Sequence, residues 1–174
     1  MIANTLTPTA SAESAQAIAA DAPALPLTPV SSIALVARSR LLTVGINAFL
    51  AEVSAMLART QISLVIVCDD AGKAVGVITE TVLVRQLGFG QADVFSTRAG
   101  DVMTHTFTTC RPEDSLPEVL AMMHERGLIH VPVLDADHHP VGVINARDGL
   151  RALLAMGNQE EALLRNYVMG VGYQ

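Results

Sequence analysis

The chain contains no tryptophan, and only 3% of its 174 residues are aromatic. It carries a formal net charge of −6 at pH 7, because 17 acidic residues outnumber 11 lysines and arginines. Surfaces that bind nucleic acid usually present a basic stripe, or aromatic side chains on which bases stack. A sequence poor in both argues against nucleic acid as a partner.

Long apolar stretches are also missing, although 51% of the residues are hydrophobic. A membrane-spanning helix needs about 20 consecutive apolar residues, whereas the run at residues 62–68 is short and contains Ser63. The N-terminus lacks the basic start of a secretory signal and carries Glu13 and Asp21. The sequence therefore predicts a cytoplasmic protein that has no membrane partner.

Side chains that could carry catalysis are few and scattered. Cys68 and Cys110 have no CxxC spacing and fall in predicted apolar strands, so we expect buried free thiols rather than a disulfide or a zinc site. The five histidines show no Ser/His/Asp or metal-ligand spacing. The sequence thus predicts no enzyme activity, no metal and no obligatory cofactor. These histidines are His105, His124, His130, His138 and His139.

What the sequence does contain is an internal repeat. The tetrapeptide Val-Gly-Val-Ile at residues 75–78 recurs at residues 141–144, an offset of 66 residues. The same offset aligns identical residues across a whole supersecondary unit, which indicates a tandem duplication. Examples are Thr43 with Thr109, Leu50 with Leu116, Glu52 with Glu118, Val65 with Val131 and Asp69 with Asp135.

Each copy predicts the order strand, helix, strand, strand, helix, from period-2 and period-3.6 patterns of apolar residues. This β-α-β-β-α order indicates a mixed α/β (α+β) fold. The first copy has predicted strands near residues 41–44, 62–68 and 74–78, and helices near 47–59 and 79–87. The second has predicted strands near 106–110, 130–134 and 141–144, and helices beginning near 115 and 145.

Composition divides the chain into five segments. We expect a flexible Ala/Pro-rich leader, two repeats, a glycine-containing linker between them, and a helical tail. The expected bounds are 1–29 for the leader, 30–88 and 101–156 for the repeats, 89–100 for the linker and 157–174 for the tail.

The end of the second copy suggests a binding site. An apolar, β-branched strand stops at Asn145, a good N-cap, and Asp148 follows three residues later in the first helical turn. Backbone N–H groups, a carboxylate and Arg147 would then meet at the carboxyl end of a strand. Phosphate could contact the amides and Arg147, and the two ribose hydroxyls could bind Asp148. The alternative is a helix cap with no further role.

Three segments of the second copy together resemble the cystathionine-β-synthase (CBS) domain family. They are Asp-Val-Met-Thr at 101–104, His-Val-Pro-Val-Leu-Asp at 130–135 and Gly-Val-Ile-x-x-x-Asp at 142–148. Tandem CBS domains form a Bateman module, and the tail at 164–170 is similar to that of stand-alone bacterial pairs. The resemblance implies two repeats packed sheet to sheet around a pseudo-two-fold axis, two clefts that bind adenine nucleotides, and a homodimer.

The family signature Gly-hydrophobic-x-Ser/Thr-x-x-Asp places its Asp on the ribose. In the second copy Gly142 and Asp148 match, Asn145 replaces the hydroxyl residue, and Arg147 lies where a phosphate contact is common. In the first copy Val82 occupies the Asp position and cannot accept a hydrogen bond. We therefore expect one good site and one degenerate cleft.

The resemblance also assigns residues around the Asp148 cleft. His130 would stack on a base or reach phosphate, or be a surface histidine; Arg38 and Arg40 would contact phosphate or be solvated. The remaining assigned positions are Ala37, Leu42, Ile62, Ser63 and Ile129.

The expected function is a regulatory module without chemistry of its own. It would bind AMP, ATP or NAD as an energy or redox-state sensor and act on an unknown regulated protein. The alternative is a structural dimerisation module whose clefts have lost their ligands.

Overall fold

The computed structural model describes residues 28–60, 62–90 and 93–170, with the backbone alone described for 159–170. Most of the predicted leader, residues 1–27, lies outside the described residues. Its last two residues do not: the Thr28 carbonyl accepts a hydrogen bond from the Leu116 amide at 2.8 Å, and Pro29 pairs with Ser115. The described part of the chain therefore begins with a contact to the second repeat.

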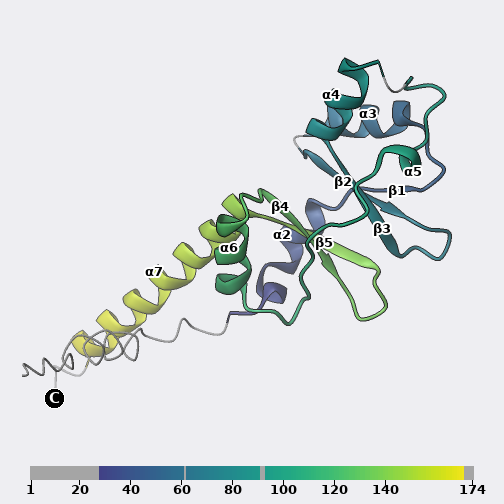
Figure 1. Cartoon of the computed structure of the whole chain (residues 1–174). Coiled ribbons are helices and arrows are strands. Elements are labelled where there is room, and N and C mark those ends of the chain that lie inside the picture. Colours follow the sequence, from purple (N-terminus) through teal and green to yellow (C-terminus); the bar gives the residue numbers. More distant parts are fainter. Residues whose placement is uncertain (1–27, 61, 91–92, 171–174) are drawn as a thin grey trace, which may run out of the picture.

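The first repeat forms a three-stranded sheet of order β1-β2-β3 (Figure 1). Strand β1 is parallel to β2, and β2 is antiparallel to β3. Its elements are the 3-10 helix η1 (Val30–Ile33), α2 (Ala34–Ser39), β1 (Thr43–Gly45), α3 (Leu50–Arg59), β2 (Leu64–Cys68), β3 (Ala74–Thr79) and α4 (Glu80–Gly88).

The second repeat has α5 (Ala99–Val102), α6 (Leu116–Glu125), β4 (His130–Leu134), β5 (Pro140–Asn145) and α7 (Ala146–Gly170). Strands β4 and β5 pair antiparallel in the same register as β2 and β3, since Val131 faces Ile144 as Val65 faces Ile78. Two small sheets with helices on their outer faces confirm the predicted fold class.

The predicted strand at residues 106–110 is wrong, because only Cys110 pairs with β4, through a single bridge to Val133. The cause is Pro132. In the first repeat the Ile66 amide donates to the Leu42 carbonyl at 2.9 Å. Pro132 occupies the position equivalent to Ile66 and has no N–H, so this pairing cannot extend to residue 108.

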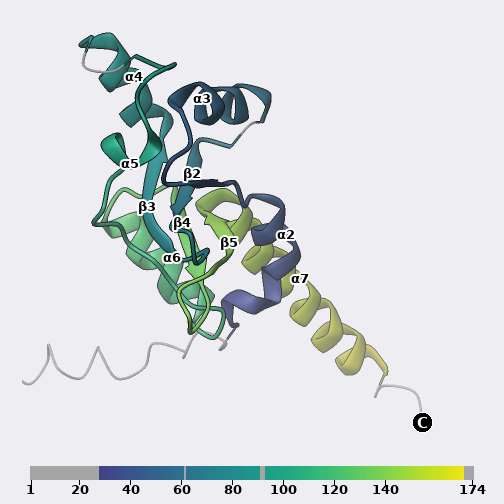
Figure 2. The same ribbon diagram turned by 90° about the vertical axis from the view of Figure 1, so that its right-hand side faces the viewer.

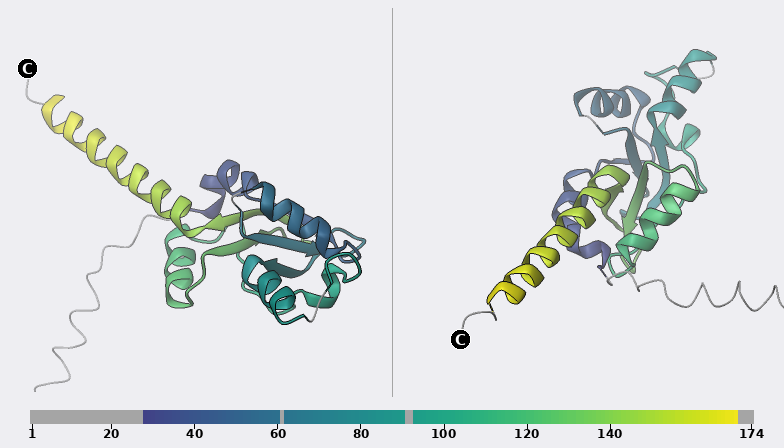
Figure 3. Two further views of the ribbon diagram at one scale, coloured as in Figure 1. Left: turned by 90° about the horizontal axis from the view of Figure 1, so that it is seen from above. Right: turned by 90° about the vertical axis from the view of Figure 1, so that its left-hand side faces the viewer.

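Helix α7 is one continuous helix from Ala146 to Gly170 and projects away from the sheets (Figures 1 and 3). The sequence instead predicts a repeat that ends near residue 156 and a separate helical tail. Gly157 lies inside the helix without interrupting it, although a helical glycine costs about 1 kcal/mol relative to alanine.

The leading helix of each repeat packs on the other repeat. Helix α2 lies against β5 (Figure 2), and Val30, Ile33 and Ala37 are buried in the core of the second repeat. In the same way, Ala99 and Met103 are buried in the core of the first repeat. A third cluster joins the two sheets face to face. Its members are Leu64, Ile66, Cys68, Val77 and Val143.

This exchange explains the glycine of the repeated Val-Gly-Val-Ile motif. A Cβ atom on Gly142 would lie 2.9 Å from the Ala37 Cβ and 3.0 Å from the Ala37 carbonyl carbon. A Cβ on Gly76 would overlap the side chain of Met103, the residue equivalent to Ala37. Each motif glycine therefore allows the incoming segment of the other repeat to approach the strand closely.

Cys68 and Cys110 are buried free thiols, as predicted. Burial, together with the nearby Asp114 carboxylate, raises the pKa of the Cys110 thiol to about 12. Because the thiolate is the reactive form, this thiol is inert at neutral pH.

Candidate functional site

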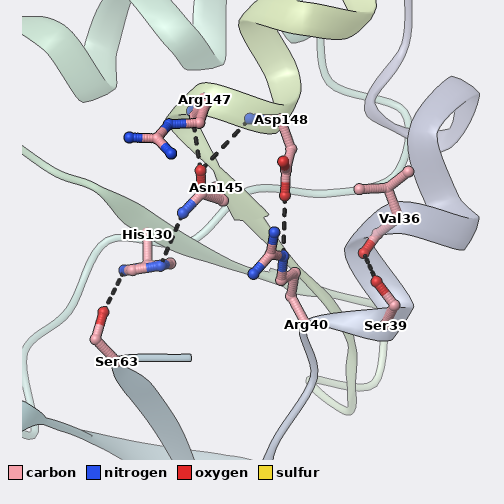
Figure 4. A network of polar contacts seen from close by, with 8 residues as sticks. All are labelled: Val36, Ser39, Arg40, Ser63, His130, Asn145, Arg147 and Asp148. Atoms are coloured by element: carbon pink, nitrogen blue, oxygen red, sulfur yellow. Dashed lines mark hydrogen bonds and ion pairs between the residues drawn. The ribbon is translucent and has the colours of Figure 1, made fainter. Parts of the chain in front are cut away.

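The predicted N-cap of α7 is present (Figure 4). The Asn145 Oδ1 atom accepts hydrogen bonds from the backbone amides of Arg147, at 2.9 Å, and Asp148, at 3.4 Å. Strand β5 ends at Asn145 and α7 begins at the next residue. The cap thereby fixes the first turn of α7, which carries Arg147 and Asp148, at the carboxyl end of a strand.

Asp148 is paired with Arg40, a residue of the first repeat. The Arg40 Nε atom donates to the Asp148 Oδ2 atom at 2.9 Å, across 108 residues of sequence (Figure 4). The Asp148 side chain is 12% exposed and that of Arg40 is 32% exposed. A charge-assisted hydrogen bond that is this well covered is screened less than a pair in open solvent.

His130 links Asn145 to the first repeat. Its Nε2 atom lies 3.0 Å from the Asn145 Nδ2 atom, and its Nδ1 atom lies 3.4 Å from the Ser63 Oγ atom. Because the cap commits the Asn145 oxygen to two amides, the Asn145 NH₂ must donate to His130. The Nε2 atom therefore accepts, and His130 is neutral with its proton on Nδ1.

The charge environment of His130 agrees with a neutral ring. Burial, and then the nearby Arg40 guanidinium, lower the pKa of His130, while Glu80 and Asp148 act in the opposite direction. Protonation would place an N–H on Nε2 facing the Asn145 NH₂, so the amide would have to turn and release the α7 cap. His130 thus connects the first repeat to the N-terminus of α7.

We expect the free energy of unfolding to fall as pH decreases below about 6.5, the ordinary histidine value. The free energy of unfolding falls because His130 binds a proton more readily in the unfolded chain than in the folded one. This contribution is present above pH 6.5 and is lost as pH falls through the lowered pKa. Urea denaturation at several pH values would measure it.

The matched controls for this pH dependence are two histidine variants. His130→Gln should remove the His130 contribution, whereas His124→Gln, which removes an exposed histidine from α6, should keep the wild-type profile. Identical pH profiles for wild type and His130→Gln would contradict the assignment.

The other assigned residues lie in three environments. Arg38 and Arg147 are exposed, and Leu42 is half-buried against the core of the first repeat. Ile62 is 7% exposed and Ala37, packed over Gly142, is 4% exposed. The structure therefore brings Arg40, Asn145, His130 and Ser63 together with Asp148 in one polar network, and places Ala37 in the core.

A cavity of 710 Å³ lies between the repeats at the pseudo-equivalent position, next to the first copy's signature. Ser63, Ile129 and His130, assigned to the Asp148 cleft, line this cavity, whereas Asp148 does not. Lining residues that sequence reasoning missed are Thr104, Thr106 and Thr108. The 66-residue offset pairs them with Arg38, Arg40 and Leu42, so the repeat already contained the signal.

The first-copy signature is capped like the second, but Thr81 and Val82 stand where the second copy has Arg147 and Asp148. The Thr79 Oγ1 atom accepts from the Val82 amide at 3.3 Å and caps α4, as Asn145 caps α7. Val82, which lines the cavity, stands at the position of Asp148, and Thr106 stands at that of Arg40. The two signatures therefore differ mainly in that Asp148 is paired with Arg40, whereas Val82 lines an open cavity.

Within the part of the chain that the structure describes, there is no group of three or more His, Cys, Asp or Glu side chains placed to hold a metal ion. None of the helices in the described ranges combines the length and the apolar character needed to cross a membrane.

Known proteins resemble this chain in sequence and in fold. It is 35% identical over 96 residues to arabinose 5-phosphate isomerase of Pseudomonas aeruginosa, a match that covers 55% of this chain and 29% of the relative. The chain spans less than half the length of the first curated relatives it matches.

Two solved structures show the same fold. CBSX2 of Arabidopsis thaliana, in complex with AMP, superposes with a TM-score of 0.63 at 21% identity, over 74% of this chain and 98% of the other. The CBS domain pair of protein MJ0100, in complex with 5′-methylthioadenosine and S-adenosylmethionine, gives a TM-score of 0.63 at 23% identity, over 75% and 99%.

The sequence model of the CBS domain family matches this chain twice, at residues 30–88 and 99–155. Each match contains one of the two sheets described above. The chain therefore belongs to the CBS domain family, as a tandem pair of CBS domains.

Proposed function

We propose that this chain is a non-catalytic regulatory module that binds an adenosine-containing ligand, AMP, ATP or NAD, in the cleft at Asp148. The observation that carries the proposal is the meeting of Asp148 and Arg40, one from each repeat, beside the capped start of α7. A ligand held there would contact both repeats, so its presence would change how they are held together.

The polar groups of this cleft match the parts of a nucleotide. The two carboxylate oxygens of Asp148 can accept hydrogen bonds from both ribose hydroxyls. Arg40 and exposed Arg147 can bind phosphate, and the first turn of α7 favours negative charge. Support also comes from CBSX2 and the MJ0100 pair, whose ligands each contain an adenosine group.

Ligand-dependent thermal unfolding tests this function. We expect AMP, ATP or NAD to raise the melting temperature, because a ligand at 100 times its dissociation constant adds about 2.7 kcal/mol of stability. GMP serves as the control for base recognition, and mass spectrometry of the purified protein would identify a retained nucleotide. If no adenosine ligand changes the melting temperature, the proposal fails.

The second candidate is a structural dimerisation module, favoured by two observations. The Asp148 carboxylate already has Arg40 as a partner, and the outer helical faces carry exposed apolar side chains at Val84, Leu150 and Leu154. We propose a homodimer in either case, since such faces usually mark an interface. Sedimentation velocity that shows a monomer at every concentration would contradict the dimer.

A further inference from the structure

The two clefts are pseudo-symmetric but only one of them contains a charged pair. At the first-copy cleft, the equivalent residues Thr106 and Val82 line a cavity of 710 Å³. At the second-copy cleft, the Arg40 side chain extends from the loop after α2 to the Asp148 carboxylate (Figure 4). Arg40 therefore contacts the group that, in the proposed function, holds the ribose.

We propose that Arg40 is an internal competitor for Asp148, and that it makes this cleft select adenosine ligands that carry a phosphate over neutral adenosine. This inference rests on the proposed function and adds to it the class of ligand and the residue that selects it.

The physical reason is the cost of an uncompensated charge. The Asp148 side chain is only 12% exposed, so without a ligand it needs Arg40 as a partner. A neutral nucleoside that takes the carboxylate through its hydroxyls leaves the Arg40 guanidinium, 32% exposed, without an anion. A phosphorylated ligand supplies that anion, so one ion pair replaces another.

The surroundings of Arg40 indicate that no other anion takes over this role. Among the described residues, Asp148 is the only carboxylate within ion-pair distance of Arg40. The nearby His130 is held neutral by its bonds to Asn145 and Ser63, and Arg40 itself contributes to lowering the pKa of His130. Arg40 released from Asp148 would thus face a neutral ring and the cleft.

The test compares AMP and adenosine by calorimetry on wild type and Arg40→Thr. This variant introduces the residue found at the equivalent position of the first copy. We expect AMP affinity to fall about fivefold, through loss of a charge-assisted bond, and adenosine affinity to rise about threefold, because Asp148 no longer has to leave a partner. The preference for AMP should therefore shrink roughly fifteenfold.

Two further variants control the result. Arg111→Thr removes an arginine whose pairing with Glu113, at 3.9 Å, is solvent-exposed, and should keep the wild-type preference. Arg40→Lys keeps the charge and should retain a preference for AMP, which also covers the case in which Arg40→Thr does not fold.

The outcomes separate this inference from the proposed function. If wild type binds none of AMP, ATP, NAD and adenosine, both are overturned. If wild type binds AMP but Arg40→Thr lowers the affinity for both ligands equally, or Arg40→Lys loses the preference for AMP, the proposed function stands and selection by Arg40 is wrong.

Discussion

Replacing Asp148 by alanine is expected to weaken the binding of AMP, ATP and NAD at least about tenfold. The carboxylate would accept two ribose hydroxyls, and hydrogen bonds to charged groups contribute roughly 1.5–3 kcal/mol each. The variant should remain folded, since an acidic residue in the first turn of a helix contributes only about 0.3–1 kcal/mol and the Arg40 side chain left without a partner is 32% exposed to solvent. Calorimetry on the folded variant measures the loss.

The matched control is Val82→Ala at the equivalent position of the first copy. Val82 is 9% exposed and has no group that can hold a ribose, so this variant should lose stability and keep the wild-type affinity. If Asp148→Ala binds every nucleotide as tightly as wild type, Asn145 and Asp148 are a helix cap and nothing more.

Replacing Gly142 by valine is expected to lower the free energy of unfolding by about 1–3 kcal/mol or more. The new Cβ would meet the Ala37 Cβ at 2.9 Å and the Ala37 carbonyl carbon at 3.0 Å, and backbone atoms cannot move aside as a flexible side chain can. Helix α2 would have to shift away from β5. Because Arg40 directly follows α2, ligand affinity should fall together with stability.

Gly45→Val is the control, since a Cβ at this strand position meets no atom within 4 Å. It should leave stability within about 0.5 kcal/mol of wild type. Urea denaturation of both variants decides the comparison, and equal stabilities would show that α2 does not press on Gly142.

The elements that local patterns determine were predicted well. The 66-residue offset identified the duplication, and the position of Asn145 after a β-branched run identified the cap of α7. Pro132 carried a local signal as well. A residue without an N–H cannot donate a hydrogen bond to a third strand, and its effect on residues 106–110 could have been read from the sequence.

What the sequence did not predict depends on contacts between distant segments. Arg40 and Asp148 were both assigned to the site, yet their ion pair spans 108 residues and depends on how α2 docks on β5. The cavity beside Val82 was expected to be a degenerate cleft. It is an open cavity lined by the short Thr106, whose counterpart in the second copy is the longer Arg40.

The exchange of leading helices has a consequence for how the chain folds. A single repeat would lack the residues that the other repeat buries in its core, so half of this chain has no complete core. Two separate copies could complete each other's cores only by associating, and their stability would then depend on protein concentration. Joining them in one chain makes that association intramolecular, with an effective concentration set by the connecting segment. The duplicated sequence should therefore unfold in one cooperative transition.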